Sequence, residues 1–178
     1  MGAEELAEVE RKLNVGIKAL DQSQGDAADT EPAAAFLNHL RESVASGRAH
    51  LTAPNGGKPD CEGSWGWLKD RDGGVDSVDV ARGHSVGWVD GTNTYLRPQA
   101  AINAANAVVA DGTARTGIGE GPMGARLNER GLLKSRESNR NTYKIRRTFC
   151  GSMECVWHLE TSTFTQGLNL ASGDDDFA

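Results

Sequence analysis

The chain has 178 residues, of which 38% are hydrophobic, and a formal net charge of −6. This length allows one domain or two small ones, with a core of modest size. The negative total argues on its face against nucleic-acid binding, and no apolar run approaches the ~20 residues of a membrane span.

Two helices are predicted at the start of the chain. Apolar residues at steps of three and four mark one stripe of a helix over residues 3–22. The stripe consists of Leu6, Val9, Leu13, Ile17 and Leu20. A second helix is capped by Thr30 and ended by Gly47. Because a polar loop links them, we expect an antiparallel helical hairpin.

Short strands follow. Residues 48–53 and 64–69 have strand-like composition and are separated by a loop rich in Pro and Gly. Residues 84–89 and 93–96 alternate on either side of Asp90-Gly91, which predicts a hairpin because glycine accepts the positive φ of the turn. These segments are expected to form a small antiparallel sheet.

The last part of the chain has the order of a winged helix. A helix opens at Pro98, and the final helix is predicted over residues 122–130 with Gly131 as its stop. A basic loop leads into two strand-like runs, 142–149 and 153–159. Helix, glycine stop, basic loop and hairpin are typical of the last helix and wing of a winged-helix domain.

We therefore predict an α+β fold in which an N-terminal helical hairpin precedes a small antiparallel sheet and a winged-helix-like domain. The predicted segments are a helical hairpin over 1–47, short strands and exposed loops over 48–83, a winged-helix-like domain over 84–160, and a polar, flexible tail over 161–178.

The charge is unevenly distributed. Nine basic and three acidic residues lie between Arg115 and Arg147, so this stretch carries +6 and the rest of the chain −12. Phosphate contacts are local and screened within ~10 Å, so a basic segment on an acidic chain favours DNA binding; the alternative is a solvated charged hairpin. The predicted nucleic-acid-binding residues are Arg126, Asn128, Arg130, Lys134, Arg136, Arg140, Lys144, Arg146 and Arg147.

Helix and wing are expected to play different parts. Arg and Asn side chains on the last helix could read base edges in a groove, whereas basic side chains on the wing contact the sugar-phosphate backbone. Gly124 either lets the helix approach a phosphate closely or permits close helix packing. Trp157 could stack on a base, although its apolar neighbours favour a place in the core.

No enzyme or metal site is expected. Cys150, Cys155 and His158, with Cys61 or His84, could supply four zinc ligands, but their spacing fits no common zinc motif. There is no nucleophile elbow and no nucleotide-binding glycine loop followed by Lys-Ser/Thr. We therefore expect no cofactor. The odd cysteine count and the polar, acidic first residues predict a reduced, cytoplasmic protein without a membrane partner.

Five segments carry a family resemblance: LRESVASGRAHLTAP, WGW, SVGWVDGTNTYLRPQAA, LNERGLLKS and RRTFCGSMECVWHL. In this order they resemble the C-terminal region of replication proteins of bacterial phages and integrated elements, over roughly residues 33–159. Those proteins have a helicase-like ATPase core, often fused to a primase-polymerase. The resemblance implies a winged-helix-like appendage that binds duplex or single-stranded DNA.

The resemblance also implies partners. An ATPase or helicase core is the expected partner, but ATP hydrolysis does not carry over because this chain has no Walker lysine loop. The alternative is a protein–protein assembly module that uses the winged helix and the stripe over residues 3–22, through a motor domain or self-association, without direct DNA contact.

Overall fold

A computed structural model describes residues 32–60, 65–69, 78–109, 117–137 and 142–166. The described residues form four helices, a mixed six-stranded sheet and a separate two-stranded hairpin, which confirms the α+β class.

The described helices and strands follow the predicted order, with three additions. Strands also form at Asp79–Ala81 and Leu133–Ser135, in predicted loops, and a helix forms at Thr161–Thr165, in the predicted flexible tail. The helices are α2 (Pro32–Ala45), α3 (Pro98–Asn106), α4 (Glu120–Glu129) and α5 (Thr161–Thr165). The strands are β1 (Ala49–Thr52), β2 (Trp67–Lys69), β3 (Asp79–Ala81), β4 (His84–Asp90), β5 (Asn93–Leu96), β6 (Leu133–Ser135), β7 (Ile145–Phe149) and β8 (Ser152–Glu160). The helix predicted over residues 3–22, and with it the helical hairpin, lies outside the described residues.

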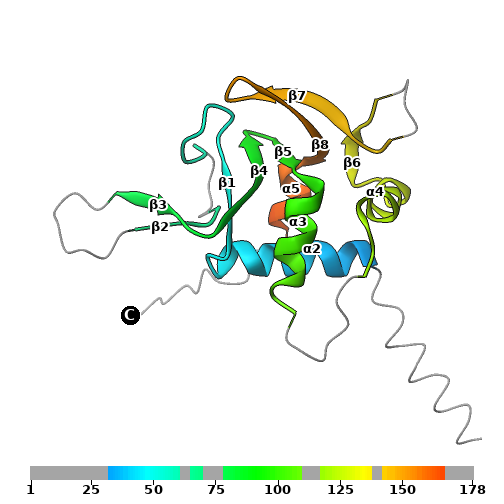
Figure 1. Cartoon of the computed structure of the whole chain (residues 1–178), viewed down its shortest axis with the longest axis horizontal. Helices are drawn as coiled ribbons and strands as arrows, with labels where there is room; N and C mark the ends of the chain where they lie inside the picture. Colours follow the sequence, from blue (N-terminus) through cyan, green and yellow to red (C-terminus); the bar gives the residue numbers. More distant parts are fainter. Residues whose placement is uncertain (1–31, 61–64, 70–77, 110–116, 138–141, 167–178) are drawn as a thin grey trace, which may run out of the picture.

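The sheet is mixed rather than antiparallel throughout, which corrects the prediction. Its strand order is β1-β4-β5-β8-β6, with β7 also paired to β8, and β1 runs parallel to β4. Parallel neighbours require a long crossover connection, and the chain between β1 and β4 is long enough to provide one. The β2–β3 hairpin forms within this crossover and projects from the body of the molecule (Figure 1).

The long strand β8 organises the predicted wing. Its second half pairs with β5 on one edge and with β6 on the other, while its first half pairs with β7. Figure 1 shows β7 arching over the top of the molecule, with α4 and β6 at the right-hand end. The β7–β8 hairpin is therefore continuous with the main sheet, and the described residues do not show a winged helix.

The two faces of the sheet bury different clusters. One face packs against the helices and contributes Leu51, Leu96, Trp157 and Leu159 to a core shared with α2, α3 and α4. On the other face, Trp88, Tyr95, Phe149 and Val156 form a smaller aromatic cluster, in which Phe149 stacks on Trp88 with ring centroids 4.0 Å apart. The core draws on all four predicted segments, and the domain boundaries stay a prediction.

Gly131 ends the last helix as the sequence predicts. It has a φ of +64°, its N–H donates to the Asn128 carbonyl, and the Leu132 N–H donates to the Leu127 carbonyl. These two bonds define a Schellman motif, which satisfies carbonyls that the helix end would otherwise leave unpaired. This turn leads the chain from α4 directly into the strand β6.

The predicted tail begins with the short helix α5. Phe164 is fully buried in this helix and stacks on Trp65 with ring centroids 5.9 Å apart. Arg41 of α2 donates hydrogen bonds to the Phe164 and Thr163 carbonyls at 2.6 and 2.5 Å. A single aromatic residue in a polar segment therefore fixes the chain after β8 to the helical core.

Candidate nucleic-acid interface

Eight of the nine predicted DNA-contacting residues lie in the described part of the chain, and Arg140 lies outside it. Arg126 and Asn128 are in α4, Arg130 is its C-terminal cap, and Lys134 is in β6. Arg136 follows β6, Lys144 precedes β7, and Arg146 and Arg147 are in β7. The strands β6 and β7 both pair with β8, so the basic residues of these two strands come from neighbouring elements.

Close packing explains Gly124. A Cβ atom at this position would lie 3.0 Å from Trp157 Nε1 and 3.0 Å from Tyr143 Cβ, so α4 touches the sheet at this residue. Trp157 is 1% exposed and meets the Phe36 ring edge-on at 5.9 Å. The contact leaves no room at Gly124 for a phosphate, and the stacking surface of Trp157 is occupied by the core.

Three predicted cations pair with glutamates of the same stretch. Arg126 lies 3.5 Å from Glu129, and Arg146 lies 3.9 Å from Glu137. Lys144 also pairs with Glu120, at the start of α4. The side chains of the Arg126–Glu129 pair are 57% and 62% exposed. An exposed ion pair of this kind contributes ~0–1 kcal/mol, so a competing anion can replace the carboxylate.

Lys134 and Arg147 face the aromatic side of the sheet. Lys134 Nζ donates to Asn93 Oδ1 at 3.0 Å and lies 3.8 Å from Glu160. The Arg147 guanidinium lies 4.5 Å from the Tyr95 ring centroid and 3.3 Å from Asp90. The predicted residues therefore do not all share one surface.

The position of Arg147 follows from strand alternation. Ile145 and Phe149 pack in the aromatic cluster, and Arg147 lies between them on the same face of β7. The long Arg147 side chain covers Tyr95 while its guanidinium reaches Asp90.

An excess of positive charge remains at the α4–β7 end. The described residues between 117 and 149 include seven Lys and Arg against three Glu. Adding the outside partners Asp90 and Glu160 still leaves two more cations than anions. Arg130 and Arg136 are both exposed. We define the α4–β7 end as Arg126, Arg130, Arg136, Lys144 and Arg146.

A polar network that the sequence did not predict connects β5, β6 and β8. His158 Nδ1 lies 2.6 Å from the Ser135 hydroxyl, and Nε2 lies 3.0 Å from Asn93 Oδ1. The imidazole stacks on Tyr95 and is 9% exposed. Burial lowers the pKa of His158, and the positive charges of Lys134 and Arg147 lower it further, while Glu160 opposes them.

The two contacts of His158 fit a neutral imidazole that donates a hydrogen bond from Nε2 and accepts one at Nδ1. The three partners lie far apart in sequence and have no diagnostic spacing, so only strand pairing could bring them together. Their effect is to join the edge strand β6 to the interior of the sheet. The expectation that the chain has no catalytic site stays a prediction.

The zinc alternative gains no support from the described residues. Cys150 and Cys155 are exposed thiols, and the part of the chain that the structure describes contains no group of three or more potential metal ligands. Cys61 lies outside that part. None of the described helices is long and apolar enough to cross a membrane.

Comparison with protein-family models, curated proteins and solved structures finds no significant match to this chain. Its function must therefore be inferred from the geometry and charge of its own residues.

Proposed function

We propose that this chain is a cytoplasmic DNA-binding accessory module of a mobile-element replication protein of the helicase or primase type. The α4–β7 end would contact the DNA backbone, and α4 followed by the β7–β8 hairpin would act as the helix and wing. The resemblance over residues 33–159 supplies the replication context, and an ATPase or helicase core would be its partner.

One observation carries the proposal: seven cations against three glutamates at one end of a chain whose net charge is −6. The Arg126–Glu129 pair is exposed and the other two pairs are partly exposed, and each pair holds two side chains in one geometry at the cost of their conformational freedom. Binding to a phosphate releases condensed counterions, which favours the DNA complex over these pairs at low salt.

The proposal is tested by fluorescence anisotropy with a labelled duplex and a labelled single strand at 50 and 200 mM salt. Arg136→Glu is the informative variant because this side chain is exposed and has no carboxylate partner among the described residues. We expect roughly tenfold weaker binding and a salt slope smaller by about one unit for each lost phosphate contact.

Lys69→Glu is the matched control, since it makes the same charge change on the exposed β2 strand. Equal losses in both variants would show that only the total charge matters. No binding by the unmodified chain to either oligonucleotide at 50 mM salt would reject the proposal.

Protein–protein assembly without DNA contact is the second candidate. Leu68 and Val80 are 43% and 37% exposed and lie directly opposite each other in the projecting β2–β3 hairpin. The stripe over residues 3–22 lies outside the described residues. Light scattering of the full chain separates the candidates: an oligomer lost on Leu13→Asp, together with absent DNA binding, would favour assembly.

A further inference from the structure

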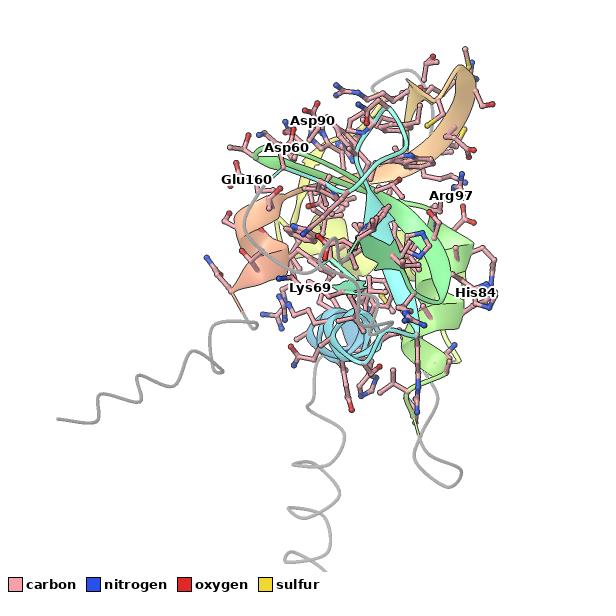
Figure 2. All side chains as sticks on the ribbon, turned by 90° about the vertical axis from the view of Figure 1, so that its left-hand side faces the viewer. Asp60, Lys69, His84, Asp90, Arg97 and Glu160 are labelled. Atoms are coloured by element: carbon pink, nitrogen blue, oxygen red, sulfur yellow. The ribbon has the colours of Figure 1, made fainter. Side chains whose placement is uncertain are left out.

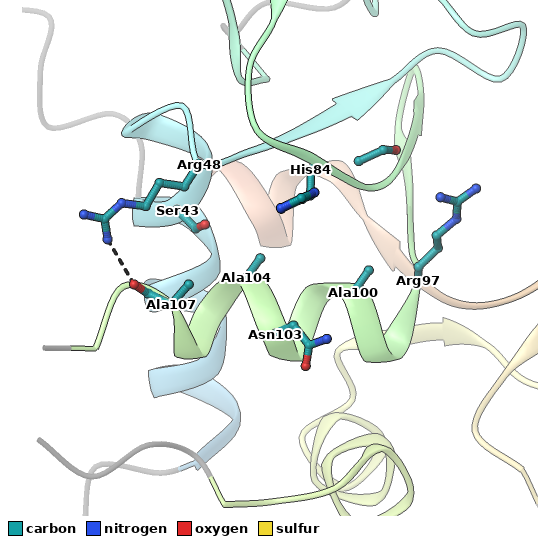
Figure 3. Close-up of a pocket in the computed structure, with 9 residues that line it drawn as sticks. Ser43, Arg48, His84, Arg97, Ala100, Asn103, Ala104 and Ala107 are labelled. Carbon is teal, nitrogen blue, oxygen red and sulfur yellow. Dashed lines mark hydrogen bonds between the residues drawn. The ribbon is translucent and has the colours of Figure 1, made fainter. Parts of the chain in front are cut away.

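A cleft of about 650 Å³ opens between α2, α3 and the beginning of β4 (Figure 3). Ala100, Ala104 and Ala107 line its α3 side, and their small side chains leave the space open. Ser43 enters from the last turns of α2, and His84 from the start of β4. The volume is typical of a site for a small molecule rather than for a single ion.

The charged groups that line this cleft are all basic. In Figure 3, Arg48 lies at one end, His84 in the middle and Arg97 at the other end. Among the described lining residues there is no Asp or Glu. Figure 2 shows His84 and Arg97 on the side of α3, away from Asp90 and Glu160. A water-accessible hollow with this lining attracts anions.

Two buried polar groups in the lining have no hydrogen-bond partner among the described residues. The Ser43 side chain is 0% exposed, and its hydroxyl points into the cleft toward His84 (Figure 3). The Arg97 Nε–H is also buried and unpaired, although Nη2 of the same side chain lies 3.2 Å from Glu154. Buried polar groups are seldom left unsatisfied in folded proteins, so each of these two groups is available to bond a ligand in the cleft.

The donors at the Ser43 end suit a phosphate group. A hydroxyl from α2, a guanidinium from the turn after α2 and an imidazole from β4 line the cleft, so they approach from different directions. A phosphate monoester presents three oxygens in a tetrahedral arrangement, whereas a carboxylate presents two in one plane. Arg48 currently donates to the Ala107 carbonyl at 3.1 Å and is exposed, so it can turn toward a ligand at little cost.

We propose that this cleft binds a small organic phosphate monoester. Ser43, Arg48 and His84 hold the phosphate, and the body of the molecule lies along Ala100 and Ala104 toward Arg97. This site is separate from the α4–β7 end, and none of the residues that define that end lines it.

The test uses the full chain and amide chemical shifts measured by NMR. The probes are a nucleoside 5′-monophosphate, inorganic phosphate and the uncharged nucleoside. We expect the monophosphate to shift the amides of Ser43, His84 and Asn103, with weaker binding of inorganic phosphate and no binding of the nucleoside. Arg48→Gln should weaken monophosphate binding at least about tenfold, because a charge-assisted contact is lost. Lys69→Gln, which removes one positive charge outside the cleft, should change nothing.

Ser43→Ala distinguishes a ligand contact from a structural one. The hydroxyl has no hydrogen-bond partner among the residues that the structure describes, so we expect an unchanged or raised Tm together with several-fold weaker monophosphate binding. A lowered Tm with unchanged binding would overturn the assignment of Ser43. Shifts that persist in Arg48→Gln, equal binding of nucleoside and monophosphate, or no shift at millimolar monophosphate would overturn the site. Arg136→Glu should leave monophosphate binding unchanged, because Arg136 does not line the cleft. The DNA proposal and the cleft proposal can therefore fail independently.

Discussion

The two basic regions of this molecule differ in what their cations already contact. At the α4–β7 end, positive side chains are dense in the sequence, but Arg126, Lys144 and Arg146 each have a glutamate partner. The cleft beside α3 is lined by two arginines from distant segments, and the buried Ser43 hydroxyl in its lining has no hydrogen-bond partner among the described residues. A high density of basic residues along the sequence therefore points to a charged surface. Polar groups without hydrogen-bond partners around a cleft point instead to a small-ligand site.

The difference also predicts two kinds of binding. Surface cations in ion pairs favour a long polyanion, because the binding free energy comes from the release of counterions at many contacts. This contribution to affinity decreases as the salt concentration rises. Converging donors in a partly enclosed space favour one compact anion, whose oxygens replace lost water hydrogen bonds.

The largest effect is expected for Trp157→Ala, which tests whether the α4–β7 end is supported by the core. Trp157 is 1% exposed and packs between α4 at Gly124 and Phe36 of α2. Urea unfolding should show that the free energy of unfolding falls by ~3–5 kcal/mol. Unchanged stability with lost DNA binding would instead mean that this indole stacks on bases.

The pH dependence of stability tests the network that holds β6 beside β8. The pKa of His158 is lower in the folded protein than its ordinary value of 6.5. The unfolded chain therefore takes up the proton first as the pH falls, so this stabilisation is present above about pH 6.5 and is lost as the pH decreases through the folded pKa. In His158→Gln, the free energy of unfolding should depend less on pH below pH 6.5. An unaltered pH profile would contradict the role of the neutral imidazole in this network.

Gly131→Ala tests the turn that sets β6 and its basic residues relative to α4. Gly131 has a φ of +64°, and an added Cβ would meet nothing within 4 Å, so the cost is conformational only. We expect a loss of about 1 kcal/mol by thermal unfolding. An unchanged Tm would contradict the claim that the positive φ of Gly131 sets this turn.

The smallest change in stability is expected for Glu137→Gln. This glutamate lies 3.9 Å from Arg146 and accepts a bond from its backbone N–H, which Gln can still accept. The free energy of unfolding should change by less than about 0.5 kcal/mol, because the ion pair is partly exposed. DNA binding should become tighter as Arg146 is released. Weaker DNA binding in this variant would mean that the glutamate orients Arg146 rather than competing for it.

Local signals in the sequence predicted the local structure well. Gly131, Asp90-Gly91 and Pro98 mark helix and turn boundaries because their effects depend on the backbone of one or two residues. The parallel pairing of β1 with β4 was not predictable in this way, since it depends on a crossover between distant segments.

The same distinction applies to the sites. The basic residues of α4, β6 and β7 are visible as a charge excess, but their glutamate partners and the inward position of Arg147 depend on strand pairing. Ser43, Arg48, His84 and Arg97 share no sequence spacing, and only the packing of α2, α3 and β4 brings them together. Phe164 was missed because one aromatic residue in a polar segment gives no periodic pattern.

Amide chemical shifts of the full chain, recorded with a DNA oligonucleotide and separately with a nucleoside monophosphate, test the account most directly. We predict that the oligonucleotide shifts amides of α4, β6 and β7, and that these shifts diminish between 50 and 200 mM salt as ~0.9 counterions are released per phosphate contact. The monophosphate should shift Ser43, His84 and Asn103 instead. Oligonucleotide shifts confined to the cleft, or absent at low salt, would contradict the claim that the α4–β7 end binds DNA.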